Sequence, residues 1–141
     1  MGPPRFSPRI AIGIIAPVGL WFGSFQTEMG GLLRLGIYLL VIVAAVIAAI
    51  RYTGVWRAFW VTFAVVYAMH ILALLFTGGA DGPPPFRWTF ELAYVFSMSV
   101  PWSFSWQATY ESIAMIAMLG ASAVAGLLST ALYRLEDKRQ L

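Results

Sequence analysis

Four long apolar stretches, separated by short breaks that contain polar residues, glycine or proline, constrain this chain more than any other feature of its sequence. An α-helix needs about 20 mostly apolar residues to cross the hydrocarbon layer of a bilayer. The stretches predict helices at about residues 10–26, 32–51, 56–77 and 111–134, of which the first is a little short. We therefore expect an all-α integral membrane protein with four transmembrane helices.

The composition agrees with this assignment. Of the 141 residues, 60% are hydrophobic and 11% are charged, whereas about 25% of the residues in a soluble domain carry a charge. A soluble fold of this length has too small a core to bury so much apolar surface. We therefore expect a single polytopic membrane domain over residues 1–141.

The distribution of Lys and Arg indicates the orientation, because short cytoplasmic segments of membrane proteins carry an excess of these residues. With four spans, seven of the nine Lys and Arg residues fall on one side of the membrane and two on the other. The seven are Arg5, Arg9, Arg51, Arg57, Arg134, Lys138 and Arg139, and the two are Arg34 and Arg87. Both chain ends are therefore expected in the cytoplasm. The scarcity of Lys beside abundant Arg, Ala and Gly is typical of a GC-rich coding sequence and favours a bacterial cytoplasmic (inner) membrane.

The segment from Phe86 to Gln107, between the third and fourth predicted helices, has a different pattern. Its even-numbered residues are all apolar or aromatic, and its odd-numbered residues are mostly polar or small. Alternation predicts an extended chain with one apolar face, since successive side chains of a strand point to opposite sides. We expect an outer β-hairpin-like segment that turns near residues 97–99. The alternative is a broken or partly helical segment at the membrane interface.

His70 is the only histidine and lies within the third predicted helix, three residues after Tyr67 on the same helical face. Ionisable residues inside a membrane span usually have a function. A lone histidine lacks the further ligands of a metal or haem centre, and the chain has no cysteine. We therefore expect no metal and no cofactor. His70 either lies near a transport path or is a neutral histidine that hydrogen-bonds a neighbouring helix or a lipid headgroup.

Three further charged residues on the outer side are candidates for ligand contacts. Arg34 lies just inside the second predicted helix, where its guanidinium can anchor the helix at the interface or bind an anion such as a lipid phosphate. Arg87 and Glu91 lie in the alternating segment. Together with His70 they define a candidate site near one leaflet.

Small residues at helical spacing mark candidate packing faces, because close backbone approach drives helix association in lipid. In the fourth predicted helix they recur every four residues, and the first helix has a Gly-x-x-x-Gly pair. These residues are Ala117, Ala121, Ala125 and Ser129, and Gly19 and Gly23. They can pack within one bundle or against another subunit.

The motifs of common enzymes are missing from the sequence, which has no nucleotide-binding loop, hydrolase elbow, zinc-protease motif or pair of catalytic carboxylates. The net charge of +3 comes from residues at helix ends, so we expect no nucleic-acid partner. The residues favour a small non-catalytic membrane subunit, or an assembly or anchoring component, of a larger complex. Its expected partners are membrane lipids and either a protein subunit or a second copy of the chain.

Two alternatives remain open from the sequence. The first is a small homo-oligomeric transporter or channel with His70 and Tyr67 near its path. The second is a lipid-binding protein or enzyme at the outer interface, whose site would combine Arg34, Arg87, Glu91 and His70.

Overall fold

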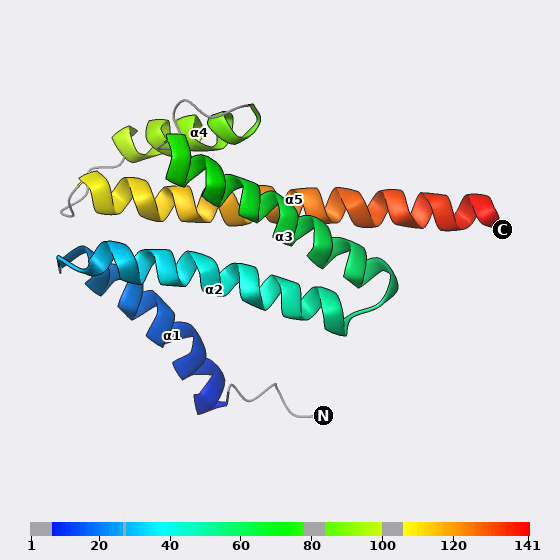
Figure 1. Cartoon of the computed structure of the whole chain (residues 1–141), viewed down its shortest axis with the longest axis horizontal. Coiled ribbons are helices and arrows are strands. Elements are labelled where there is room, and N and C mark those ends of the chain that lie inside the picture. Colours follow the sequence, from blue (N-terminus) through cyan, green and yellow to red (C-terminus); the bar gives the residue numbers. More distant parts are fainter. Residues whose placement is uncertain (1–6, 27, 78–83, 100–105) are drawn as a thin grey trace. The chain divides into compact units, whose positions relative to one another are not determined.

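The computed structural model of the chain describes residues 7–26, 28–77, 84–99 and 106–141, and all regular elements in these ranges are helices (Figure 1). The elements are α1 (Pro8–Gly23), the short 3-10 helix η1 (Ser24–Gln26), α2 (Gly30–Arg51), α3 (Gly54–Thr77), α4 (Phe86–Ser99) and α5 (Trp106–Gln140). The prediction of an all-α protein is confirmed for this part of the chain.

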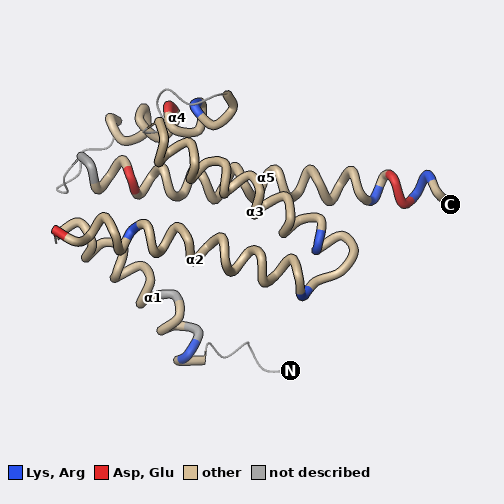
Figure 2. The backbone as a smooth tube through the Cα atoms, in the orientation of Figure 1, with Lys and Arg blue, Asp and Glu red and all other residues tan. Residues whose placement is uncertain are grey.

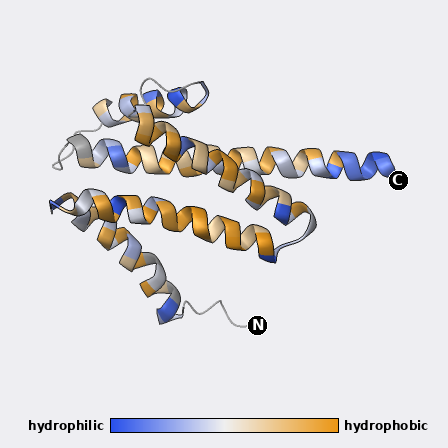
Figure 3. Ribbon diagram, viewed as in Figure 1, coloured by the Kyte–Doolittle hydropathy of each residue, from blue (hydrophilic) through white to orange (hydrophobic). Residues whose placement is uncertain are grey.

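Three of the helices are long and apolar enough to cross a membrane, by length and composition. They are α2, α3 and the part of α5 from Ala108 to Gln140, and Figure 3 shows how continuously apolar residues cover α2 and most of α3. The helix α1 has 16 residues and is about 24 Å long, which is less than the ~30 Å hydrocarbon layer. Three described helices meet these criteria. The predicted count of four transmembrane helices is therefore not supported.

The turn between α2 and α3 depends on a glycine. Gly54, the first residue of α3, has a φ of 62°. This left-handed conformation is accessible to glycine and strained for residues with a Cβ. The N–H of Tyr52 donates to the carbonyl of Ala48 over 2.9 Å, which continues the bonding of α2 up to this turn.

The chain divides into two compact units, Met1–Leu40 (unit 1) and Val41–Leu141 (unit 2). In unit 1, the buried ring of Trp21 on α1 is central. It packs edge-on against Phe25 at 5.8 Å and against Tyr38 of α2 at 5.4 Å between ring centroids. The prediction of one polytopic domain over residues 1–141 stays a prediction.

Unit 2 is built around α5, which packs against both α3 and α4. A row of buried residues recurs every four positions along α5, namely Ala114, Met118, Ser122 and Gly126. A methyl group at Gly126 would lie 2.6 Å from Cδ2 of Phe59 on α3. The absence of a side chain at this position therefore lets the two long helices approach closely, as small residues commonly do in membrane proteins.

The helix α4 corrects the prediction for residues 86–107. Residues Phe86–Ser99 are helical and α5 already begins at Trp106, so the β-hairpin-like segment is wrong for the described residues. The turn expected near residues 97–99 falls in the last turn of α4, and residues 100–105 lie outside the described residues. The partly helical alternative agrees with α4.

The reason for this error is physical. The buried residues of α4 are Phe90, Ala93 and Ser97, which share one helical face. Many of the other apolar residues are exposed, such as Trp88 and Leu92. Alternation identifies a strand only when water surrounds its polar side, whereas apolar side chains can face lipid or protein from any side of a helix. A helix also satisfies its own backbone hydrogen bonds at low polarity, which an open hairpin edge does not.

Candidate functional site

The clearest polar contact between α3 and α4 is made by His70 of α3, whose residue is 2% exposed. Its Nδ1 lies 2.8 Å from the carbonyl oxygen of Val66, and its Nε2 lies 3.1 Å from Oγ1 of Thr89 on α4. A carbonyl oxygen only accepts hydrogen bonds, so Nδ1 carries the hydrogen and donates it. In the neutral ring, Nε2 then accepts the hydrogen of the Thr89 hydroxyl. Both ring nitrogens are therefore engaged within the chain.

Two aromatic rings of α4 complete the surroundings of His70. The ring of Phe86 lies perpendicular to the imidazole at 4.7 Å, and the ring of Phe90 lies at 6.2 Å. His70 precedes the end of α3 at Thr77 by seven residues, or about 10 Å along the helix. The helix α4 therefore begins at the level of His70.

Tyr67 lies one turn before His70 and is fully buried. Its ring stacks on that of Phe63 with a centroid distance of 6.0 Å, and its hydroxyl donates to Sδ of Met115 on α5 over 3.4 Å. Tyr67 and His70 thus share the packed side of α3, where Tyr67 bonds α5 and His70 bonds α4. Their predicted place near a transport path stays a prediction.

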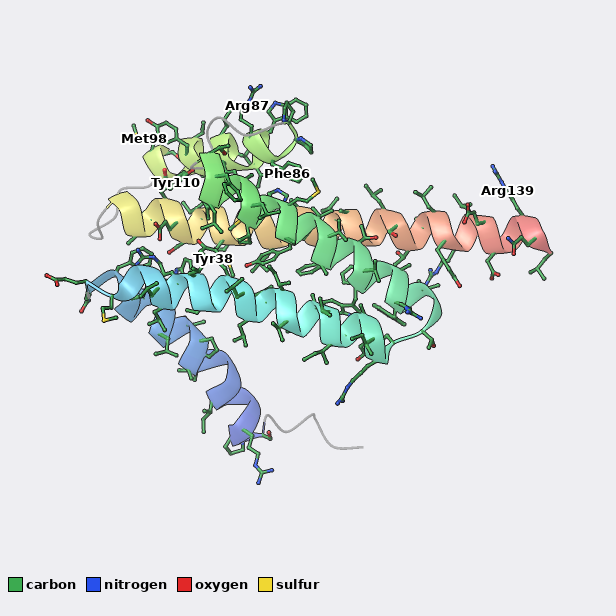
Figure 4. All side chains as sticks on the ribbon, viewed as in Figure 1. Tyr38, Phe86, Arg87, Met98, Tyr110 and Arg139 are labelled. Atoms are coloured by element: carbon green, nitrogen blue, oxygen red, sulfur yellow. The ribbon has the colours of Figure 1, made fainter. Side chains whose placement is uncertain are left out.

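Arg87 and Glu91 lie one turn apart on α4 and form an ion pair, with 3.5 Å between Nε and Oε1. Their side chains are 42% and 59% exposed, so the pair contributes only about 0.3–0.5 kcal/mol to stability. Figure 4 shows the side chain of Arg87 pointing away from α5. The structure therefore brings Arg87, Glu91 and His70 to the same end of α4, with His70 buried and the ion pair exposed.

Glu91 also borders a cavity of about 430 Å³ between α4 and the start of α5. Its other walls include Tyr94 of α4 and Tyr110 of α5, whose rings meet edge-on at 6.4 Å. We call the region around His70, α4 and the first turns of α5 the α4 end of unit 2.

Arg34 belongs to unit 1. One of its terminal nitrogens donates to the carbonyl oxygen of Ser24 over 3.2 Å and lies 3.3 Å from the hydroxyl of the same residue. Its guanidinium carbon lies 4.3 Å from the centroid of the Phe25 ring, a cation–π distance. Arg34 therefore joins α2 to η1, and its predicted role at the interface or toward an anion stays a prediction.

The predicted packing residues lie in two settings. Gly19 and Gly23 of α1 are exposed, and a methyl group at either would meet no atom within 4 Å. The α5 residues are partly buried on one side of its buried row; they are Ala117, Ala121, Ala125 and Ser129. Their predicted use as an interface with another subunit stays a prediction.

Sequence reasoning missed the partners of His70, namely Thr89, Phe86 and Phe90. A signal for two of them was present, because Phe86 and Phe90 fall on one face of a helix together with Ala93 and Ser97. The competing alternation at the same positions hid this spacing.

Within the described ranges, no group of three or more His, Cys, Asp or Glu side chains could hold a metal ion. Comparisons of the chain with models of protein families, with curated proteins and with solved structures find no match. The function is therefore argued from the residues themselves.

Proposed function

We propose that the chain is a small non-catalytic subunit, or an assembly or anchoring component, of a larger membrane complex. The outward face of α4 is the observation that carries this proposal. Trp88, Leu92 and Val95 lie at helical spacing opposite the buried face and are 58%, 58% and 64% exposed. We call these three residues the outward face.

The surroundings of the outward face favour a protein partner over lipid. The ion pair of Arg87 and Glu91 lies directly beside Trp88 and is partly exposed. Hydrocarbon would penalise such charges, whereas an apolar centre with charged residues at its rim is the usual composition of a protein interface. Trp is also enriched among the residues that dominate binding energy.

The transporter alternative is second, because it requires His70 to exchange protons or ligands. Both nitrogens of His70 are engaged with Val66 and Thr89. A catalytic function at the outer interface is third, since Arg87 and Glu91 are bonded to each other.

To test for a partner, the intact particle is purified from native membranes in mild detergent. Its mass is then determined and every chain in it is identified. We expect a larger membrane protein in a fixed ratio. Trp88→Ala with Leu92→Ala should lower its recovery on the order of tenfold or more. The matched control is Leu127→Ala with Leu128→Ala on α5, two residues of similar exposure, which should leave recovery unchanged. A particle that contains only copies of this chain would overturn the proposal.

We further propose that the α2–α3 turn and the end of α5 face the cytoplasm of a bacterial cell. With α1 as a fourth span, the cytoplasmic side receives seven basic residues and the other side two; without it, Arg5 and Arg9 fall on the other side and the count is five against four. The residues that are cytoplasmic in either case are Arg51, Arg57, Arg134, Lys138 and Arg139, and those on the other side in either case are Arg34 and Arg87. The bias has the same direction in both cases and is much larger with α1 as a span. Arg9 at the start of α1 favours α1 as a fourth span with the N-terminus also inside.

The chain has no cysteine, so single introduced cysteines report topology without background. Cysteines at Thr53 and Asp137 should resist a membrane-impermeant maleimide applied to intact cells, and one at Ser99 should react. The opposite pattern would overturn the orientation. A cysteine at Ser7 tests α1 separately. Labelling there would show that α1 does not cross the membrane and would leave the assignment of the other three spans unchanged.

A further inference from the structure

A second cavity, of about 440 Å³, lies between the start of α3 and the last apolar turns of α5. We call this region the turn end of unit 2, since the α2–α3 turn borders it. Four of the residues that line it have polar side chains: Arg57 and Thr62 of α3, and Ser129 and Tyr133 of α5. All four side chains can donate hydrogen bonds.

These four side chains make no hydrogen bond or ion pair within the described part of the chain. This is unusual for the hydroxyls, because other helical hydroxyls of α5 bond to the backbone of their own helix. Ser122 donates to the carbonyl of Met118, and Thr130 donates to that of Leu127, each over 2.7 Å. Thr62 and Ser129 instead leave their donors available to a molecule in the cavity.

A smaller cleft of about 280 Å³ adjoins this cavity. Apart from Arg57, its lining is wholly apolar, with Val46, Ala49 and Ile50 from α2 and Val61, Ala64 and Val65 from α3. Arg57 and Val61 border both spaces. From Arg57 the cleft follows α3 toward its middle, which is the direction of the membrane interior for a spanning helix. Arg57 therefore stands between a space lined by hydrogen-bond donors and a space lined by aliphatic side chains.

The charge at the turn end is positive. Figure 2 shows basic residues at the end of α2, the start of α3 and the end of α5. Arg51 and Arg57 lie at the α2–α3 turn, and the last turns of α5 after Tyr133 add three basic residues and the acids Glu136 and Asp137, for a net charge of 5 − 2 = +3. An anion is therefore favoured over a cation as the occupant.

We propose that the turn end binds an anionic phospholipid. Its phosphate contacts the guanidinium of Arg57, whose planar fork matches phosphate oxygens. The hydroxyls of Thr62, Ser129 and Tyr133 donate to the remaining headgroup oxygens. One acyl chain occupies the cleft beside Val61. The leaflet is cytoplasmic if the proposed orientation holds, whereas binding itself is independent of orientation and of any protein partner.

Binding is tested with the full chain in detergent, titrated with phosphatidylglycerol and followed by native mass spectrometry. Arg57→Gln should raise the Kd on the order of tenfold or more, as expected for loss of a charged hydrogen bond. Thr62→Val with Ser129→Ala should raise it several-fold. Arg51→Gln is the matched control, because it removes the same charge at the same end from a residue outside both spaces. It should change the Kd less than about twofold.

The competing probes are phosphatidylcholine and inorganic phosphate. We expect phosphatidylcholine to bind more weakly than phosphatidylglycerol, and inorganic phosphate not to displace the lipid. Displacement by inorganic phosphate at comparable concentration would show a soluble-anion site and overturn the lipid assignment. Equal losses for Arg57→Gln and Arg51→Gln would show attraction by charge alone and would also overturn it. A protein chain released by Arg57→Gln in place of lipid would contradict the proposal as well.

Discussion

At the α4 end of unit 2, His70 contacts Thr89 and Arg87 pairs with Glu91, whereas the polar side chains at the turn end line an open cavity. His70 is buried with both ring nitrogens engaged. Arg57 and Thr62 make no such bond in the described residues. An unbonded buried polar group costs about 1–3 kcal/mol, so the α4 end needs its internal bonds. At the turn end, the open cavity lets external oxygens supply them.

This comparison predicts that polar residues stabilise the protein at the α4 end and bind ligand at the turn end. The largest effect is expected for His70→Ala, because it removes a buried ring and leaves a space between Phe86 and Phe90. We expect a loss of about 3 kcal/mol in unfolding free energy, measured by denaturant titration in detergent. Hydrogen exchange in α4 should accelerate too. A stable variant that has lost only transport would place His70 in a transport path and contradict its expected role in stability.

The next effect tests the α3–α5 contact that holds both ends in one unit. Gly126→Ala places a methyl group against the ring of Phe59 and should cost about 1–3 kcal/mol through overpacking. Gly120→Ala is the control, since a methyl group there meets no atom within 4 Å. Adding Phe59→Leu to Gly126→Ala should restore part of the thermal stability. Equal stability of the two alanine variants would show that α3 and α5 are not in close contact.

A smaller effect isolates the bond between α3 and α4. Thr89→Val removes the hydroxyl that His70 Nε2 contacts at 3.1 Å and should cost about 1 kcal/mol. In a double-mutant cycle with His70→Ala, most of this cost should disappear. Additive effects of the two substitutions would show that the side chains do not interact.

The smallest effect on stability is expected for the hydroxyls at the turn end. Thr62→Val and Ser129→Ala should change unfolding free energy by less than about 0.5 kcal/mol in lipid-free detergent, because neither hydroxyl has a partner in the described chain. With phosphatidylglycerol present, the unsubstituted protein should gain more stability than the variants. A large loss without lipid would mean that these hydroxyls serve the fold.

The long helices could be predicted from the sequence because crossing a bilayer requires a minimum apolar length. The structure has α2 at Gly30–Arg51 where residues 32–51 were predicted, and α3 at Gly54–Thr77 where residues 56–77 were predicted. The helix α5 extends to Gln140, well past the apolar stretch. Its last turns include Arg134, Glu136, Lys138 and Arg139, which favour helix without being apolar.

The α4 end and the turn end depend on contacts between distant parts of the sequence. A bond of His70 to a neighbouring helix is one of the two roles that the sequence predicts, but the sequence does not identify Thr89, because the alternation predicts an extended chain for residues 86–107. In the sequence, Arg57 indicates only the orientation of the chain. Its cavity exists because of how α3 and α5 pack, and the sequence pattern of either helix alone does not contain that information.

The position of α4 has a consequence for synthesis in the cell. α4 is 14 residues long and packs on α5, yet α5 leaves the ribosome after it. Until α5 inserts, α4 lacks this neighbour and keeps its contacts with α3, in which Phe86, Thr89 and Phe90 meet His70. The packing of α4 is therefore completed only when α5 has been made. If synthesis stops before residue 106, the aromatic side chains of α4 stay accessible to chaperones and membrane proteases.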